Sequence, residues 1–195
     1  MNKRTRIGLL WVLLCLPALG MLGGWVTGRA TAEALLHPTG EFSVRLLILT
    51  LVATPLQLLL PRYRLPRWLL RNRRYLGVAS FGYALLHTAF YLLHEGWVGA
   101  GVEFTRPALL TGWLAFFIYV PLAVTSTDGF VRRMGKAWKK LQNWTHVAAV
   151  LVLLHWVLLE YAVLPALVHF LPVALLQAYR IFRRRTDAAG KELRR

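Results

Sequence analysis

The sequence lacks most of the signatures of a soluble enzyme or a disulfide-stabilised secreted domain. It contains one cysteine, Cys15, so the chain can form no internal disulfide and carries no CxxC zinc or thiol-redox motif. We recognise no nucleophile–base pair, phosphate-binding loop, carboxylate dyad, internal repeat or low-complexity stretch. The sequence therefore predicts no catalytic residue of its own.

Acidic residues are also scarce. The chain has 8 Asp and Glu against 24 Lys and Arg, a net charge of +16, yet only 16% of its residues are charged. A strongly basic chain often binds nucleic acid. That class is excluded here because the basic residues lie between long apolar segments and not along one folded face.

Long apolar segments dominate what is present. The chain is 57% hydrophobic, with a mean hydropathy of +0.49. A bilayer core of about 30 Å needs roughly 20 helical residues. We predict an all-α polytopic helical bundle of about six transmembrane helices over 7–27, 42–60, 75–94, 108–124, 141–161 and 164–181. A signal peptide is the alternative for the first, but its apolar stretch exceeds the usual roughly 7–15 residues.

The basic residues predict the orientation. Segments 1–6, 61–74, 125–141 and 180–195 hold 3, 6, 5 and 7 Lys and Arg residues, so 21 of the 24. Alternate loops of a six-helix chain share one side of the membrane, and the positive-inside rule places such loops in the cytoplasm. We therefore predict cytoplasmic N- and C-termini, a transmembrane domain over 1–182 and a basic cytoplasmic tail over 183–195.

Two histidines are predicted to lie at the same depth in the membrane. His87 follows Tyr75 by 12 residues and His155 follows Gln142 by 13, and both helices run outward. Both imidazoles would then lie about 18–20 Å from the cytoplasmic edge, where two facing imidazoles can supply the axial ligands of a b-type haem. A CxxCH sequence is absent, which excludes covalent c-type attachment. Histidines that only make interhelical hydrogen bonds are the alternative.

Neighbouring residues are consistent with a flat cofactor. We expect small residues to leave room for it (Ser80, Ala84 and Ala148) and aromatic residues to form its walls (Tyr83, Tyr91 and Trp156). Arg45, near the outer end of the second helix, could pair with a haem propionate or extend to the membrane interface.

Several short stretches then make the sequence recognisable as a family member. They include His37-Pro38-Thr39-Gly40, Tyr83-Ala84-Leu85-Leu86-His87 and Leu154-His155-Trp156. The most specific is Leu122-Ala123-Val124-Thr125-Ser126-Thr127, followed by Gly135-Lys136-Ala137-Trp138. Over about residues 35–160 the chain resembles the MsrQ or YedZ family, the haem-binding membrane subunits of the bacterial protein-methionine-sulfoxide reductase system. That family belongs to the ferric-reductase-like transmembrane group.

The resemblance implies a function and its cofactors. It implies a multi-pass protein of the bacterial inner membrane that binds haem b through His87 and His155, with FMN as a second candidate cofactor. Electrons would pass from the quinone pool to a periplasmic, molybdopterin-containing methionine sulfoxide reductase subunit. The chain would thus be an electron-transfer subunit of an oxidoreductase system and not its catalytic subunit. A haem-free transporter or scaffold is the alternative from another class.

One departure from the family concerns a second haem. Relatives usually carry Leu-His where this chain has Leu141-Gln142. His146, one turn further along the helix, is the candidate replacement, and we expect one haem per chain.

The remaining polar residues have open roles. We expect His37 in an outer loop, and His94 and His169 near the outer interface. Arg73 and Arg74 are predicted to bind membrane lipid phosphates, with a flavin phosphate as the alternative.

Overall fold

The structure is a computed structural model that describes residues 2–160 and 163–192, and all regular secondary structure in this part of the chain is helical. Its helices are α1 (Lys3–Val26), α2 (Ala32–Leu59), α3 (Arg64–Glu103), α4 (Pro107–Val124), α5 (Asp128–Met134), α6 (Lys136–Gln142), α7 (Trp144–Glu160) and α8 (Val163–Glu192). Among the described residues, six helical segments are long and apolar enough to span a membrane. The predicted all-α class and the number of spans are confirmed.

The second helix begins ten residues earlier than predicted. Thr31 caps the N-terminus of α2, where its hydroxyl accepts a hydrogen bond from the Ala34 backbone N–H at 3.2 Å. Pro38 lies inside the helix without ending it, as membrane helices tolerate. His37 therefore lies on a helix, and its predicted place in a loop is wrong.

Three other segments differ from the prediction. Helix α3 runs for 40 residues and bends at Gly96, whose φ of 71° is in the left-handed region that favours glycine. The fifth predicted span is divided at Asn143 into the short helix α6 and the helix α7. Helix α8 continues to Glu192, so it includes most of the segment predicted as a tail.

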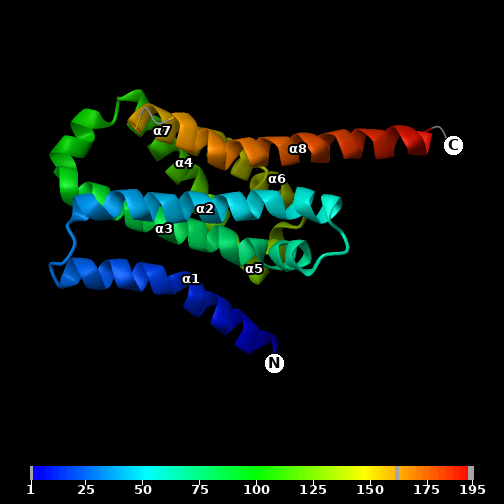
Figure 1. Cartoon of the computed structure of the whole chain (residues 1–195), viewed down its shortest axis with the longest axis horizontal. Helices are drawn as coiled ribbons and strands as arrows, with labels where there is room; N and C mark the ends of the chain where they lie inside the picture. Colours follow the sequence, from blue (N-terminus) through cyan, green and yellow to red (C-terminus); the bar gives the residue numbers. More distant parts are fainter. Residues whose placement is uncertain (1, 161–162, 193–195) are drawn as a thin grey trace.

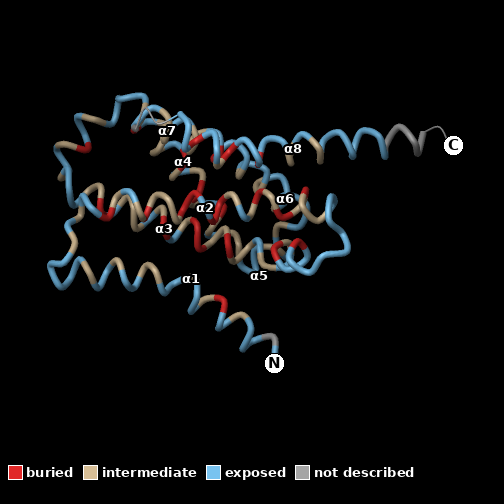
Figure 2. The backbone as a smooth tube through the Cα atoms, in the orientation of Figure 1, coloured by how far each residue is buried: buried red, intermediate tan, exposed pale blue. Residues whose placement is uncertain are grey.

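The helices form one elongated bundle (Figure 1). Helices α2 and α3 pack along their length, α4 packs against α7, and α8 lies along α2. The Gln177 amide on α8 donates to the Leu51 carbonyl on α2 at 2.8 Å. Buried residues gather in the middle of this bundle, whereas α1 is largely exposed (Figure 2). The exposed apolar side chains of α1 are suited to contact lipid.

A tyrosine attaches the exposed helix α1 to the bundle. Pro17 interrupts the backbone hydrogen bonds of α1. The Tyr83 hydroxyl on α3 donates to the Leu14 carbonyl at 2.8 Å and accepts from the Ala18 N–H at 3.1 Å. The Tyr83 hydroxyl therefore bonds to a backbone carbonyl and a backbone N–H of α1 on either side of Pro17. The prediction that Tyr83 lines the cofactor site is wrong.

All four basic segments lie at one end of the bundle. In Figure 1 the N-terminus, the α2–α3 connection, and helices α5 and α6 lie toward that end, and the end of α8 projects beyond it. We call this the basic end, and the opposite end the outer end. The basic segments therefore lie on one side of the bundle, as the charge pattern predicts. That this side faces the cytoplasm stays a prediction.

Candidate functional site

The two histidines predicted at equal depth face each other between α3 and α7. The ring centroids of His87 and His155 are 6.3 Å apart, and the ring planes are nearly perpendicular at 84°. These residues are far apart in the sequence. They come together because helices α3 and α7 border the same cavity. The structure therefore brings the two histidines together. Their role as metal ligands stays a prediction.

Each imidazole is oriented by a backbone carbonyl on a neighbouring helix. The Nδ1 of His87 donates to the Leu36 carbonyl on α2 at 3.0 Å, and the Nδ1 of His155 donates to the Ala108 carbonyl on α4 at 2.7 Å. Because a carbonyl can only accept, both rings carry their proton on Nδ1 in their neutral form. The lone pair is then on Nε2, which is the usual arrangement of a metal-binding histidine.

Two glycines allow the rings to approach these helices. A Cβ atom at Gly40 would lie 3.3 Å from the His87 Nδ1, and one at Gly112 would lie 2.7 Å from the His155 Nδ1. The second distance is too short for any side chain. Glycine is therefore required at position 112 for His155 to keep its place against α4.

A large cavity adjoins both rings. It has a volume of about 930 Å³, within the range of cofactor sites of about 300–1,000 Å³. Ala84 lines it, as predicted for a small residue beside a flat cofactor, and so do five aromatic residues: Tyr91, Trp113, Phe116, Tyr119 and Trp156. We refer to it as the histidine cavity.

Ser80 has a different role from the one predicted. Its hydroxyl donates to the Ser43 carbonyl at 2.8 Å, and the Ser43 hydroxyl donates to the Ser80 carbonyl at 3.0 Å. This reciprocal pair joins α2 to α3 in the buried core. Ser80 therefore brings the two helices close together and does not border the histidine cavity.

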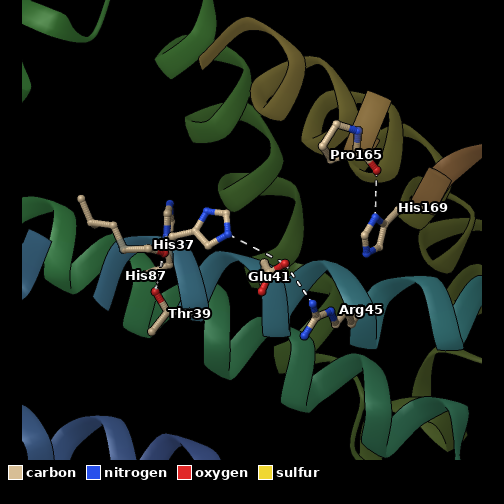
Figure 3. A network of polar contacts seen from close by, with 8 residues as sticks. His37, Thr39, Glu41, Arg45, His87, Pro165 and His169 are labelled. Atoms are coloured by element: carbon tan, nitrogen blue, oxygen red, sulfur yellow. Dashed lines mark hydrogen bonds and ion pairs between the residues drawn. The ribbon is translucent and has the colours of Figure 1, made fainter. Parts of the chain in front are cut away.

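The rim of the histidine cavity carries paired charges. His37 and Arg45 both contact Glu41, at 3.8 Å and 2.9 Å respectively (Figure 3). Arg45 is half exposed and does not line the cavity. Arg106 does line it, and it forms an ion pair with Glu103 at 2.7 Å.

The other histidines lie at different distances from the facing pair. His94 lines the histidine cavity and lies 3.6 Å from a Glu95 carboxylate oxygen. His169 packs on Trp156 with ring centroids 5.1 Å apart, and it donates to the Pro165 carbonyl at 2.8 Å.

His146 lies near the basic end, in a second cavity of about 410 Å³ that Gln142 also lines. The structure therefore does not bring His146 to the facing histidines.

The glycines and the two carbonyl acceptors are functional features that the sequence analysis missed. A glycine in an apolar helix usually reports only close helix packing. The sequence feature that could have revealed them is the dipeptide Thr-Gly. It occurs as Thr39-Gly40 and as Thr111-Gly112, once on each helix that contacts a histidine.

Comparison with known proteins agrees with the helical membrane fold. The bundle and the facing histidines define a multi-pass membrane protein with a candidate cofactor site between its helices. Residues 39–154 match the family described as the ferric reductase like transmembrane component.

Two relatives are named as haem-binding subunits MsrQ of protein-methionine-sulfoxide reductase. The one from Azospira oryzae is 34% identical over 90% of this chain and 78% of its own length. The one from Yersinia pseudotuberculosis is 33% identical over 89% of this chain and 93% of its own length. The chain belongs to the MsrQ family, within the ferric-reductase-like transmembrane group, and is a multi-pass protein of the bacterial inner membrane.

Proposed function

We propose that the chain is a b-type haem electron-transfer subunit in which His87 and His155 supply the two axial ligands. The observation that carries this proposal is the pair of facing imidazoles, each fixed through Nδ1 by a carbonyl. The two rings lie 6.3 Å apart beside a cavity of about 930 Å³, and both carry the lone pair on Nε2, the atom through which histidine usually binds a metal. The residues present therefore fit the group.

Bound haem would supply reversible one-electron chemistry, which an apolar protein lacks. The chain's own residues hold the ligands and exclude water. Leu36 and Ala108 orient the imidazoles, and the aromatic walls keep the site apolar. Arg106 lines the cavity and is the cation best placed to bind a propionate, whereas Arg45 lies outside it; either arginine would exchange its present carboxylate partner, Glu103 or Glu41, for the propionate.

The position of the site supports a direction for the electrons. The histidine cavity lies toward the outer end, where its rim includes Glu33, Glu41, Glu95 and Glu103. We propose that electrons from the quinone pool leave here to the molybdopterin-containing catalytic subunit of a periplasmic methionine sulfoxide reductase. This partner corresponds to the system after which the MsrQ relatives are named.

We expect one haem per chain. The Gln142 amide donates to the Leu122 carbonyl at 3.2 Å and lies 3.5 Å from the Ser126 hydroxyl. It thus ties α6 to the end of α4, and an amide is a poor iron ligand compared with imidazole. A pyridine haemochrome assay on the purified protein should give a haem-to-protein ratio near one, and His146→Ala should leave that ratio unchanged.

Two results would contradict this expectation. A ratio near two that falls to one in His146→Ala would show that His146 completes a second site. A purified protein without any Soret absorbance, after expression with sufficient haem, would favour a haem-free transporter or scaffold.

We further propose that the cavity near the basic end binds the phosphate of a flavin such as FMN. Arg73, Arg180 and Arg184 line it close to one another, and no Asp or Glu is among its described lining residues. Arg73 donates to the Thr54 hydroxyl at 3.2 Å, so an anion could replace a neutral partner there. Trp138 and Phe81 offer flat apolar surface for a ring system.

The position of this basic cavity suits electron transfer. Tyr119 is buried and contributes to the walls of both cavities. A flavin in the basic cavity would therefore be separated from the histidine cavity by little more than one layer of side chains. Membrane lipid phosphates are the competing ligands for the same arginines.

The phosphate contribution can be measured directly. The double variant Arg73→Gln with Arg180→Gln should weaken FMN binding, followed by flavin fluorescence quenching, by about tenfold or more, because charge-assisted hydrogen bonds are lost. The affinity for riboflavin, which lacks the phosphate, should not change. The matched control is Arg132→Gln with Arg133→Gln on α5, outside the basic cavity. Equal weakening of both flavins would contradict a phosphate site.

A further inference from the structure

The two histidines have the same arrangement of neighbouring residues, one on α2 and one on α4. On α2, the carbonyl that accepts from His87 belongs to the residue four positions before Gly40. On α4, the carbonyl that accepts from His155 belongs to the residue four positions before Gly112. In both cases the glycine is in contact with the imidazole, so the repeat concerns the ligand environment itself.

A threonine precedes each glycine, and its hydroxyl reaches the same carbonyl. Thr39 donates to the Leu36 carbonyl at 3.0 Å and to the Leu35 carbonyl at 2.6 Å. Thr111 donates to the Ala108 carbonyl at 2.7 Å and to the Pro107 carbonyl at 3.1 Å. The imidazole and the hydroxyl thus share one acceptor at each site. Figure 3 shows Thr39 beside His87, where the hydroxyl oxygen lies 3.5 Å from the Nδ1.

Sharing an acceptor weakens each of the bonds that it receives. A backbone carbonyl has two lone pairs, and in a helix one of them already accepts the N–H four residues later. The hydroxyl and the imidazole N–H therefore compete for the remaining capacity. A weaker bond to Nδ1–H leaves less electron density on Nε2, since such second-shell bonds raise the basicity of the ligand.

We propose that Thr39 and Thr111 are a matched pair of positioning residues that set how strongly His87 and His155 donate electrons to the haem iron. This inference rests on the proposed function, because it requires both histidines to be iron ligands. Each hydroxyl reduces the acceptor strength of the shared carbonyl. The reduction potential of the haem is thereby kept higher than it would be with the carbonyls free.

The two sites are unequal in a way that the structure defines. The shorter hydroxyl bond of Thr111 goes to the carbonyl that holds His155, whereas the shorter bond of Thr39 goes to Leu35, which holds no imidazole. The competition is therefore stronger at His155. Loss of the Thr111 hydroxyl should have the larger effect.

The test is the midpoint potential of the haem in valine and serine variants of the purified full-length chain. Thr111→Val should shift the potential to more negative values, and Thr39→Val should shift it less in the same direction. Both variants should retain the haem content and low-spin spectrum of the wild type. Thr111→Ser and Thr39→Ser, which keep a hydroxyl, should restore the wild-type potential.

The matched control is Thr125→Val at the C-cap of α4. The Thr125 hydroxyl also donates to a carbonyl of its own helix, that of Pro121 at 2.7 Å, but far from either histidine. This variant should leave the potential unchanged. If Thr111→Val fails to retain haem, the serine variants and Thr39→Val still decide the proposal.

The outcomes separate this inference from the function on which it rests. An unshifted potential in both valine variants with normal haem content overturns the role of the threonines alone. A serine variant that shifts as far as its valine counterpart also overturns it. A wild-type protein without haem, or histidine variants that keep it, overturns the proposed function and this inference with it.

Discussion

Replacing either His87 or His155 with alanine is expected to remove most of the bound haem. Each substitution deletes one axial bond and leaves the other imidazole facing an empty position. Even loss of a supporting second-shell group commonly costs about 10–100-fold in metal affinity, so loss of a ligand should cost at least that much. The measurement is the Soret absorbance per purified protein, with membrane insertion checked by the yield of folded monodisperse protein.

His94→Ala is the matched control for the ligand variants. His94 lies in the same helix as His87 and lines the same cavity, but it contacts Glu95 and not the facing pair. This variant should retain most of the haem. Wild-type spectra in both His87→Ala and His155→Ala would refute the bis-imidazole site. Loss of haem in His94→Ala alone would indicate that His94 is a ligand.

Gly112→Ala is expected to impair haem binding on the order of tenfold or more, by displacing a ligand without removing it. The added Cβ would lie 2.7 Å from the His155 Nδ1, so the ring must move away from the Ala108 carbonyl. Alanine is the better helix former by about 1 kcal/mol, so helix α4 itself should not be weakened. Haem titration together with thermal unfolding of the apoprotein separates the two effects.

Two other glycines calibrate this prediction. Gly40→Ala should have a smaller effect, because its Cβ would lie 3.3 Å from the His87 Nδ1 and a small shift relieves the contact. Gly82→Ala should have none, since a Cβ there meets nothing within 4 Å, although Gly82 shares helix α3 with His87. Similar losses in all three variants would show that general helix packing, and not the imidazole contact, is responsible.

Helix boundaries show where local sequence patterns were insufficient. The apolar run after Phe42 marks the membrane core of α2, but the helix begins at Ala32 because Thr31 caps it. Proline and histidine in the first turns conceal this start, since both are common in loops. The division at Asn143 was missed because Asn143 keeps a helical backbone conformation, so no proline or glycine in the sequence marks the break.

Some predictions of which side chains line the site were right and others were wrong, for one reason. Ala84, Tyr91 and Trp156 line the histidine cavity as expected, whereas Ser80 and Tyr83 face other helices. Helical spacing predicts which residues share a face of one helix. It does not predict which neighbour that face meets, and α3 meets α1 and α2 as well as the cavity.

The sequence by itself determined the membrane class, the six spans and the grouping of basic segments at one end, and it predicted an equal depth for the two histidines. These follow from hydropathy, charge and the fixed rise of a helix, which are properties of single segments. Only the tertiary structure decided which carbonyls orient the imidazoles and which glycines admit them. Those features depend on distances of a few ångströms between α2 and α3 and between α4 and α7. Such distances arise from packing between segments, which no periodicity within one helix encodes.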